Sequence, residues 1–151
     1  MWYNIAAHEH ERPIDSEIWH RDNDDLNVLT LFLYLDDVSS ENGPFSYIKK
    51  SQRGGKYDHI APAVPPLGSY PSSEEIYPQI PVEQIIQCEG LRGTAILSDT
   101  SGLHLGGRVK SGSRLVLTAR YVTNAGIDRY SYVCEPSSSN NSTPRERFLL
   151  S

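Results

Sequence analysis

A continuous apolar segment, LNVLTLFLYLDDV at residues 26–38, sets the fold class expected for this chain. It is apolar on both faces, contains the β-formers Val28, Thr30, Phe32 and Tyr34, and shows no charged face. A surface helix needs a polar face, whereas a strand buried on both sides shows an unbroken apolar run. We therefore predict a buried strand at residues 26–38.

Other segments have the composition of shorter strands, and turn-forming stretches such as SSENG and GLRG separate them. The predicted strands are at residues 2–10, 16–20, 43–51, 83–89, 94–99 and 113–123. Short strands, Gly-rich connections and no convincing amphipathic helix predict an all-β (mainly β) sandwich or barrel with few or no helices. We place this one domain at residues 1–135.

Two segments fall outside this pattern. Residues 57–83 hold six of the ten prolines, so we predict a long loop that shapes access to a site. Residues 136–151 are polar and low in complexity, and we predict a flexible tail.

Composition excludes several function classes. The formal net charge is -5, which argues against a nucleic-acid partner because phosphate binding needs a basic face. No apolar run is long enough to span a membrane, and no signal peptide is visible. Cys88 and Cys134 form no CxxC pair, which predicts reduced thiols and a cytoplasmic location.

The stretch SEIWHRDNDD, residues 16–25, places His20 and Asp22 two residues apart at a strand end. Residues i and i+2 of a strand share a face and lie about 6.5 Å apart, so both side chains can bind one ion. His104 follows a later apolar strand and is flanked by glycines. Two imidazoles and one carboxylate form the facial triad of non-haem Fe(II) oxygenases.

Arg114 comes ten residues after His104, at the start of a predicted strand. A guanidinium makes two charge-assisted bonds to a carboxylate at once, so it suits a dicarboxylate. An HxD motif, a distant His and then an Arg form the order expected for an iron enzyme that uses 2-oxoglutarate.

These residues carry a resemblance to a known family. WHRDNDDLNVLTLFLYLDDVSSENGPFSYIKKSQRGG, followed by GTAILSDTSGLHLGGRVKSGSRLVLTARYV, resembles the phytanoyl-CoA dioxygenase family within the Fe(II)/2-oxoglutarate-dependent oxygenases. The similarity covers residues 16–123. It implies a double-stranded β-helix, that is, a jelly-roll or cupin-like core.

The resemblance also implies roles for individual residues. His20, Asp22 and His104 are expected to bind Fe(II), and Arg114 to pair with the far carboxylate of 2-oxoglutarate. Thr30 is expected to add a polar contact to the co-substrate. The implied reaction uses O2, hydroxylates a small-molecule substrate and releases succinate and CO2.

Two alternatives stay open. A zinc hydrolase would use the same three ligands with an open water position. A non-catalytic or truncated jelly-roll binding protein is the other, because the segment before His20 is shorter than is usual in that family. An uncovered sheet face would also favour a homo-oligomer.

Four further residues have weaker claims. Asp99 either fixes a ligand histidine or caps a turn, and His59 lies in the proline-rich loop. Arg108 and Lys110 would attract an anionic substrate or remain solvated. The pair His8 and His10 has the two-residue spacing of the candidate ligands, but we interpret it as exposed surface.

Overall fold

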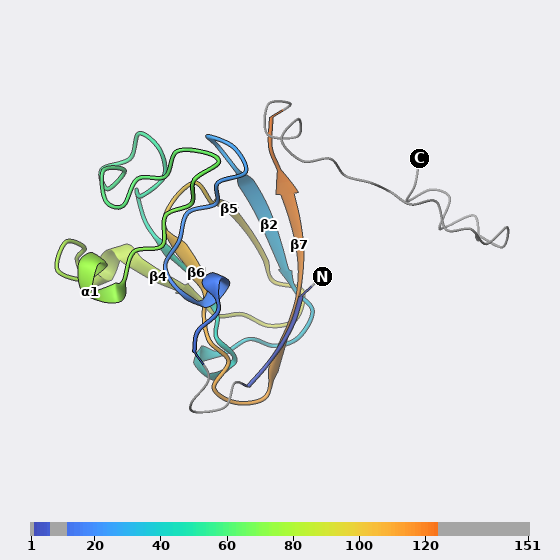
Figure 1. Ribbon diagram of the computed structural model, residues 1–151. Helices are drawn as coiled ribbons and strands as arrows, with labels where there is room; N and C mark the ends of the chain where they lie inside the picture. Colours follow the sequence, from blue (N-terminus) through green and yellow to red (C-terminus); the bar gives the residue numbers. More distant parts are fainter. Residues whose placement is uncertain (1, 7–11, 124–151) are drawn as a thin grey trace, which may run out of the picture.

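Two antiparallel β-sheets face each other in the computed structural model, which describes residues 2–6 and 12–123 (Figure 1). The larger sheet has the order β1-β7-β2-β5, formed by Trp2–Ile5, Ser113–Tyr121, Leu29–Tyr34 and Ala95–Asp99. The smaller sheet has the order β4-β3-β6, formed by Ile85–Cys88, Phe45–Ile48 and His104–Gly106. This mainly β arrangement of two antiparallel sheets is consistent with the jelly-roll prediction.

The apolar segment 26–38 supplies the central strand β2, which pairs with β5 on one side and β7 on the other. The strand is shorter than predicted, and in the segments before and after it side-chain carboxylates bind backbone amides. The Asp25 carboxylate accepts hydrogen bonds from Leu26 N and Thr123 N, and the Asp37 carboxylate accepts one from Arg92 N. The prediction of burial on both faces is wrong: Thr30 and Tyr34 are buried, but Leu29 is 42% exposed.

The structure differs from the predicted strands in two places, one before β2 and one after it. Residues 16–20 form no strand, because Asp15–Glu17 is a 3-10 helix (η1) and only His20 makes an isolated bridge, to His104. His104–Gly106, which lies outside the predicted strands, forms β6 and pairs with β3 from Phe45 to Tyr47. Residues 7–10 of the first predicted strand lie outside the described residues, as does the predicted tail.

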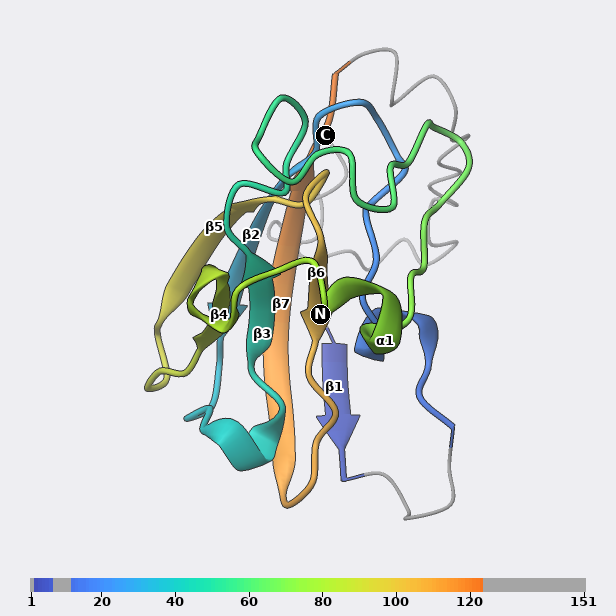
Figure 2. The ribbon, with the colours of Figure 1, turned by 90° about the vertical axis from the view of Figure 1, so that its left-hand side faces the viewer.

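The proline-rich segment contains the one α-helix of the described ranges, α1, at Ser73–Ile76 (Figure 2). A capping box starts it: Ser72 Oγ accepts from Glu75 N, and the Glu75 carboxylate accepts from Ser72 N. Pro78 and Pro81 follow closely, so the helix stays at one turn. Two short 3-10 helices, η2 and η3, occupy Ser40–Asn42 and Val82–Gln84.

The turn before β3 packs closely against the segment that joins β6 to β7. Gly43 has a φ of +67°, and a Cβ there would lie 2.1 Å from the carbonyl oxygen of Gly107. Asn42 Nδ2 donates to the carbonyls of Ser111 and Ser113, farther along the same connection. The turn predicted from SSENG therefore depends on a glycine that permits close backbone approach.

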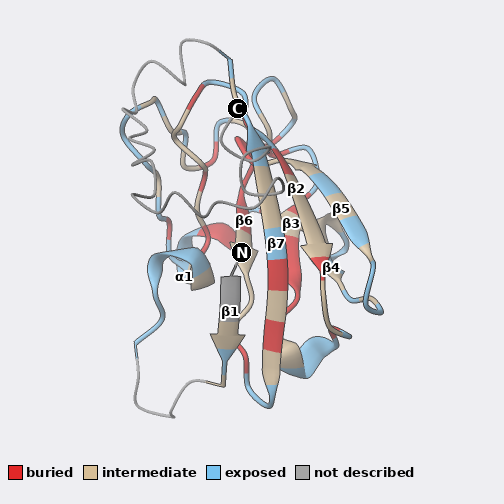
Figure 3. Ribbon diagram, turned by 90° about the vertical axis from the view of Figure 1, so that its right-hand side faces the viewer, coloured by how far each residue is buried: buried red, intermediate tan, exposed pale blue. Residues whose placement is uncertain are grey.

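The apolar core has two parts. One lies under α1 and contains Trp19, Ile48, Tyr57, Ile60, Ile76, Ile80 and Leu103. The other lies between the sheets and contains Tyr34, Val38 and Val116, with Phe32 and Ile96 packed against it. The outward face of the four-stranded sheet stays largely uncovered, as the exposed stretches of β5 and β7 show (Figure 3). None of the helices in the described ranges has the length and apolar character needed to cross a membrane.

Candidate metal centre

The segment 20–22 runs antiparallel to the segment 100–104, and this pairing brings the predicted ligands together. His20 N donates to His104 O over 2.9 Å, and His104 N donates to His20 O over 3.0 Å. Asp22 N donates to Thr100 O over 2.9 Å. Residues separated by 84 positions (His20 and His104) and by 78 positions (Asp22 and Thr100) thereby face each other through backbone hydrogen bonds.

The three side chains converge on one point. Asp22 Oδ1 lies 4.0 Å from His20 Nε2 and 3.9 Å from His104 Nε2, and the ligand atoms of the trio all lie within 4.8 Å of one another. Nδ1 of His20 contacts Ile18 O and Nδ1 of His104 contacts Gly102 O, each over 2.9 Å. A carbonyl oxygen only accepts, so each Nδ1 carries the proton and each Nε2 keeps a lone pair for a metal.

Burial keeps one of these imidazoles neutral. His104 is 4% exposed, and desolvation lowers its pKa well below the usual 6.5, with the nearby His20 adding to this shift. A neutral imidazole is the form that ligates a metal.

Asp22 has a second partner that the sequence did not suggest. Arg120 Nη2 donates to Asp22 Oδ1 over 3.2 Å, and Arg120 Nη1 pairs with the Asp24 carboxylate. The same Nη2 lies 3.1 Å from Asp22 Oδ2, but without hydrogen-bond geometry, so Oδ2 is a buried oxygen with no donor among the described residues. A buried carboxylate oxygen that lacks a donor favours a bound cation nearby.

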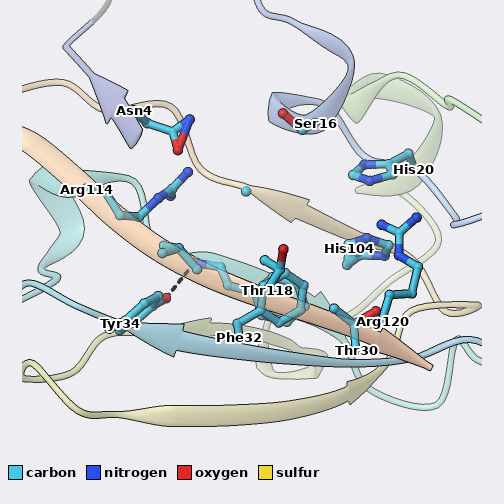
Figure 4. A pocket seen from close by; sticks show the side chains of 13 residues that line it. Asn4, Ser16, His20, Thr30, Phe32, Tyr34, His104, Arg114, Thr118 and Arg120 are labelled. Carbon is cyan, nitrogen blue, oxygen red and sulfur yellow. Dashed lines mark hydrogen bonds between the residues drawn. The ribbon is translucent and has the colours of Figure 1, made fainter. Parts of the chain in front are cut away.

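A cavity of about 150 Å³ opens beside the trio, between the two sheets. Figure 4 shows His20, His104 and Arg120 at one end of it and Arg114 with Asn4 at the other. Phe32 and Phe45, whose ring centroids are 4.5 Å apart, form part of the apolar wall between these ends.

Arg114 lies where the sequence predicts an anion-binding group. It is 6% exposed, and burial lowers the pKa of its guanidinium. Nη1 donates to Gly107 O over 3.0 Å, while Nε is buried and has no acceptor in the described part of the chain. A buried cation with an unsatisfied donor in the lining of a cavity suits a ligand carboxylate.

Thr30 also lines the cavity, but its hydroxyl is engaged. Thr30 Oγ1 lies 2.8 Å from Thr100 Oγ1, and the Thr100 hydroxyl donates to Val28 O. Each hydroxyl has one proton, so Thr30 donates to Thr100 and has only acceptor capacity left. The predicted contact from Thr30 to a carboxylate therefore requires this hydroxyl pair to rearrange, and the role stays a prediction.

The weaker candidates lie away from the centre or act locally. Asp99 caps a turn, because its carboxylate accepts from Ser101 N and Oγ, and backbone carbonyls fix the ligand histidines instead. Arg108 and Lys110 pair with acidic neighbours, Glu17 at 3.8 Å and Glu41 at 3.7 Å. His59 is exposed and outside the cavity lining, while His8 and His10 lie outside the described residues.

Two residues of the site were missed at the level of sequence. Arg120 is six positions after Arg114 on β7, so strand alternation alone would have placed both on the cavity face. The ring of Tyr70 stacks at 15° on His20, with centroids 6.0 Å apart. Tyr70 comes from the proline-rich loop, and no spacing rule connects that loop to His20.

The residues present fit a divalent metal with open positions. Two Nε2 lone pairs and Asp22 Oδ1 converge from one side, and the cavity lies on the other. Imidazole and carboxylate donors in this facial arrangement suit Fe(II).

Comparisons with known proteins agree with this geometry. A search of curated proteins gave no match. The family model described as Phytanoyl-CoA dioxygenase (PhyH) matches residues 11–116. This range covers most of the chain and includes the trio, Thr30 and Arg114, which confirms the resemblance inferred from the sequence. The chain therefore belongs to the phytanoyl-CoA dioxygenase (PhyH) family, within the Fe(II)/2-oxoglutarate oxygenase superfamily.

Proposed function

We propose that the protein is an Fe(II)- and 2-oxoglutarate-dependent dioxygenase that hydroxylates a small-molecule substrate. The observation that carries this proposal is the pairing of two features at one cavity: the His20–Asp22–His104 trio, whose two histidines line it, and the buried, incompletely satisfied guanidinium of Arg114. Family membership supports the same activity.

The trio would hold the iron. His20 and His104 contribute Nε2, each oriented by a backbone carbonyl at Nδ1, and Asp22 contributes Oδ1. When bound, iron and 2-oxoglutarate supply the oxidising power that places one atom of O2 on a C–H bond, with succinate and CO2 as co-products.

Arg114 would bind the far carboxylate of 2-oxoglutarate. Its Nε is the unsatisfied donor, and the apolar side chains around it exclude water, which strengthens a charge-assisted bond. Gly106 leaves room beside it, because a Cβ there would lie 3.3 Å from Arg114 Nη2. The co-substrate would thus extend along the cavity from Arg114 to the trio.

The size of the cavity limits what else it holds. The cavity of about 150 Å³ has roughly the volume that holds a benzene-sized molecule, and it is partly open to solvent. The co-substrate fills such a space, so the prime substrate would approach from the open mouth. Tyr70, 51% exposed and stacked on His20, would border that approach.

Anaerobic titration with Fe(II) and then 2-oxoglutarate tests the proposal. We expect a weak visible charge-transfer band in the wild type and none in His104→Ala. Tight zinc binding with no response to 2-oxoglutarate would instead favour a zinc hydrolase on the same ligands. A wild type that binds no metal would favour a non-catalytic jelly roll.

A further inference from the structure

Arg21, the residue between the two ligands of the HxD motif, is a buried cation. It is 3% exposed, and desolvation lowers the pKa of its guanidinium. Its side chain lies outside the cavity that His20 and His104 line and points toward the loop 51–61. Among the described residues, no carboxylate lies within ion-pair distance of it, so its charge is met in another way.

Backbone carbonyls surround the guanidinium. Nη1 donates to Ser51 O over 2.5 Å and to Ser101 O over 2.7 Å, and Nε donates to Ala61 O over 3.0 Å. Nη2 donates to Ile60 O over 2.9 Å, with longer bonds to the carbonyls of Tyr57 and Asp58. One planar fork thus satisfies acceptors from the loop 51–61 and from the turn before β6, which lie at the same end of the molecule (Figure 2).

The turn before β6 is the segment that orients the third ligand. Ser101 O accepts from Arg21, and the next carbonyl, Gly102 O, fixes Nδ1 of His104. Leu103 N donates to Ser51 Oγ, so the loop 51–61 is tied to the same turn. The side chain of Arg21 is therefore hydrogen-bonded to the backbone segment that carries His104. Its own backbone lies between His20 and Asp22 in the sequence.

We propose that Arg21 is a positioning residue that sets the geometry of the metal centre by joining the segment 20–22 to the turn 101–103 and to the loop 51–61. The inference rests on the proposed metal site. It goes beyond that site because Arg21 touches neither metal nor substrate.

Lysine cannot replace this group. Lysine keeps the charge, but all three of its N–H donors are on a single nitrogen. The carbonyls around Arg21 are instead contacted by Nε, Nη1 and Nη2, the three nitrogens of a planar guanidinium. Several buried carbonyls would lose their donor in Arg21→Lys. The turn 101–103 would lose the side-chain hydrogen bond from residue 21 to Ser101 O.

The test measures metal affinity separately from stability. Metal-free wild type, Arg21→Lys and the control Val38→Ala are titrated with Co(II), each at the same interval below its own unfolding midpoint, and the visible d–d bands are recorded. Val38 is 3% exposed and lies in the other core cluster, so its truncation destabilises the fold away from the ligands. We expect Co(II) affinity to fall about tenfold or more in Arg21→Lys, with altered bands, and to stay at the wild-type value in Val38→Ala.

A second measurement needs only the wild type. Coupling is reciprocal, so Co(II) binding is expected to slow hydrogen exchange of amides in the loop 51–61, which contains no ligand. An Arg21→Lys variant with wild-type affinity and spectrum, or unchanged exchange in that loop, would overturn the inference. Absence of Co(II) binding by the wild type would instead overturn the metal site itself and this inference with it.

Discussion

The two faces of the four-stranded sheet have opposite characters although the same strands form them. The cavity face carries Asn4, Thr30, Phe32, Tyr34, Arg114, Val116, Thr118 and Arg120. The outward face carries Leu29, Leu31, Leu33, Ala95, Leu97, Leu115, Leu117, Ala119 and Tyr121. The inner face thus combines cations and hydroxyls with aromatic rings, whereas the outer face is mainly apolar, with Asp99 beside Leu29 at the end of β5.

This difference shows that, in this sheet, a buried side chain is not always apolar and an exposed one is not always polar. Arg114 on the inner face is 6% exposed, while Leu97 on the outer face is 63% exposed. Buried polar groups are costly unless they bind a partner, and exposed apolar patches mark contacts with another surface. The proposed metal and co-substrate would be the partners of the polar groups on the inner face. The apolar outer face is the surface through which the predicted homo-oligomer would form.

The largest expected effect is on the inner face at Asp22. Asp22→Ala removes one of three ligands, so we expect hydroxylation to be abolished and Fe(II) affinity to fall sharply. Succinate formation and anaerobic Fe(II) titration measure these effects. Leu97→Ala is the matched control on the outer face, and a loss of activity in both variants would break the comparison.

Arg114→Ala is expected to weaken 2-oxoglutarate binding about ten- to a hundredfold while iron remains bound, because a hydrogen bond to a charged group contributes about 1.5–3 kcal/mol. Titration of the charge-transfer band with 2-oxoglutarate measures this affinity. Arg108→Ala serves as control, since Arg108 lies outside the cavity lining. Unchanged co-substrate affinity in Arg114→Ala would remove the assignment.

The pH dependence of stability tests whether His104, a buried polar residue that lines the cavity, is neutral in the folded protein. Its folded-state pKa is lowered by burial, so the unfolded chain binds a proton more readily as the pH falls below about 6.5. We expect the free energy of unfolding of the metal-free protein to decrease on acidification by up to about 1.4 kcal/mol per pH unit from this group. Urea unfolding between pH 7.5 and 5.5 measures the slope, and His104→Gln should flatten it. An identical slope in that variant would contradict a buried neutral imidazole.

The smallest expected effect concerns the outer face. Leu97→Lys changes an exposed position, so we expect less than about 0.5 kcal/mol of change in stability and unaltered iron binding. If the outer face mediates self-association, the variant shifts the sedimentation profile toward monomer. Leu67→Lys is the control, because Leu67 is an exposed loop residue, at 74% against 63% for Leu97. Self-association that persists in Leu97→Lys would place the contact elsewhere.

The predicted ligands and Arg114 lie close to one cavity in the structure, and their roles stay predictions, whereas several predicted strand boundaries differ from the observed ones. The ligand trio and Arg114 follow from chemistry that few residue types perform, at spacings that suit a strand end. β6 was missed because His104–Gly106 is glycine-rich and its strand pairing depends on β3, almost sixty residues earlier. Residues 16–20 were mistaken for a strand because local composition gives no information on whether a pairing partner exists.

By itself, the sequence determined the fold class, the family and which side chains are candidates to bind a metal and a co-substrate, because strand composition and ligand identity are local properties. Only the tertiary structure showed that Arg120 contacts Asp22 and that Arg21 joins three backbone segments. It also showed that the leucines of β2 lie on the outward face of the four-stranded sheet. These features arise from contacts between residues remote in the chain. Side-chain alternation makes such contacts possible, but the packing of the two sheets selects which of them form.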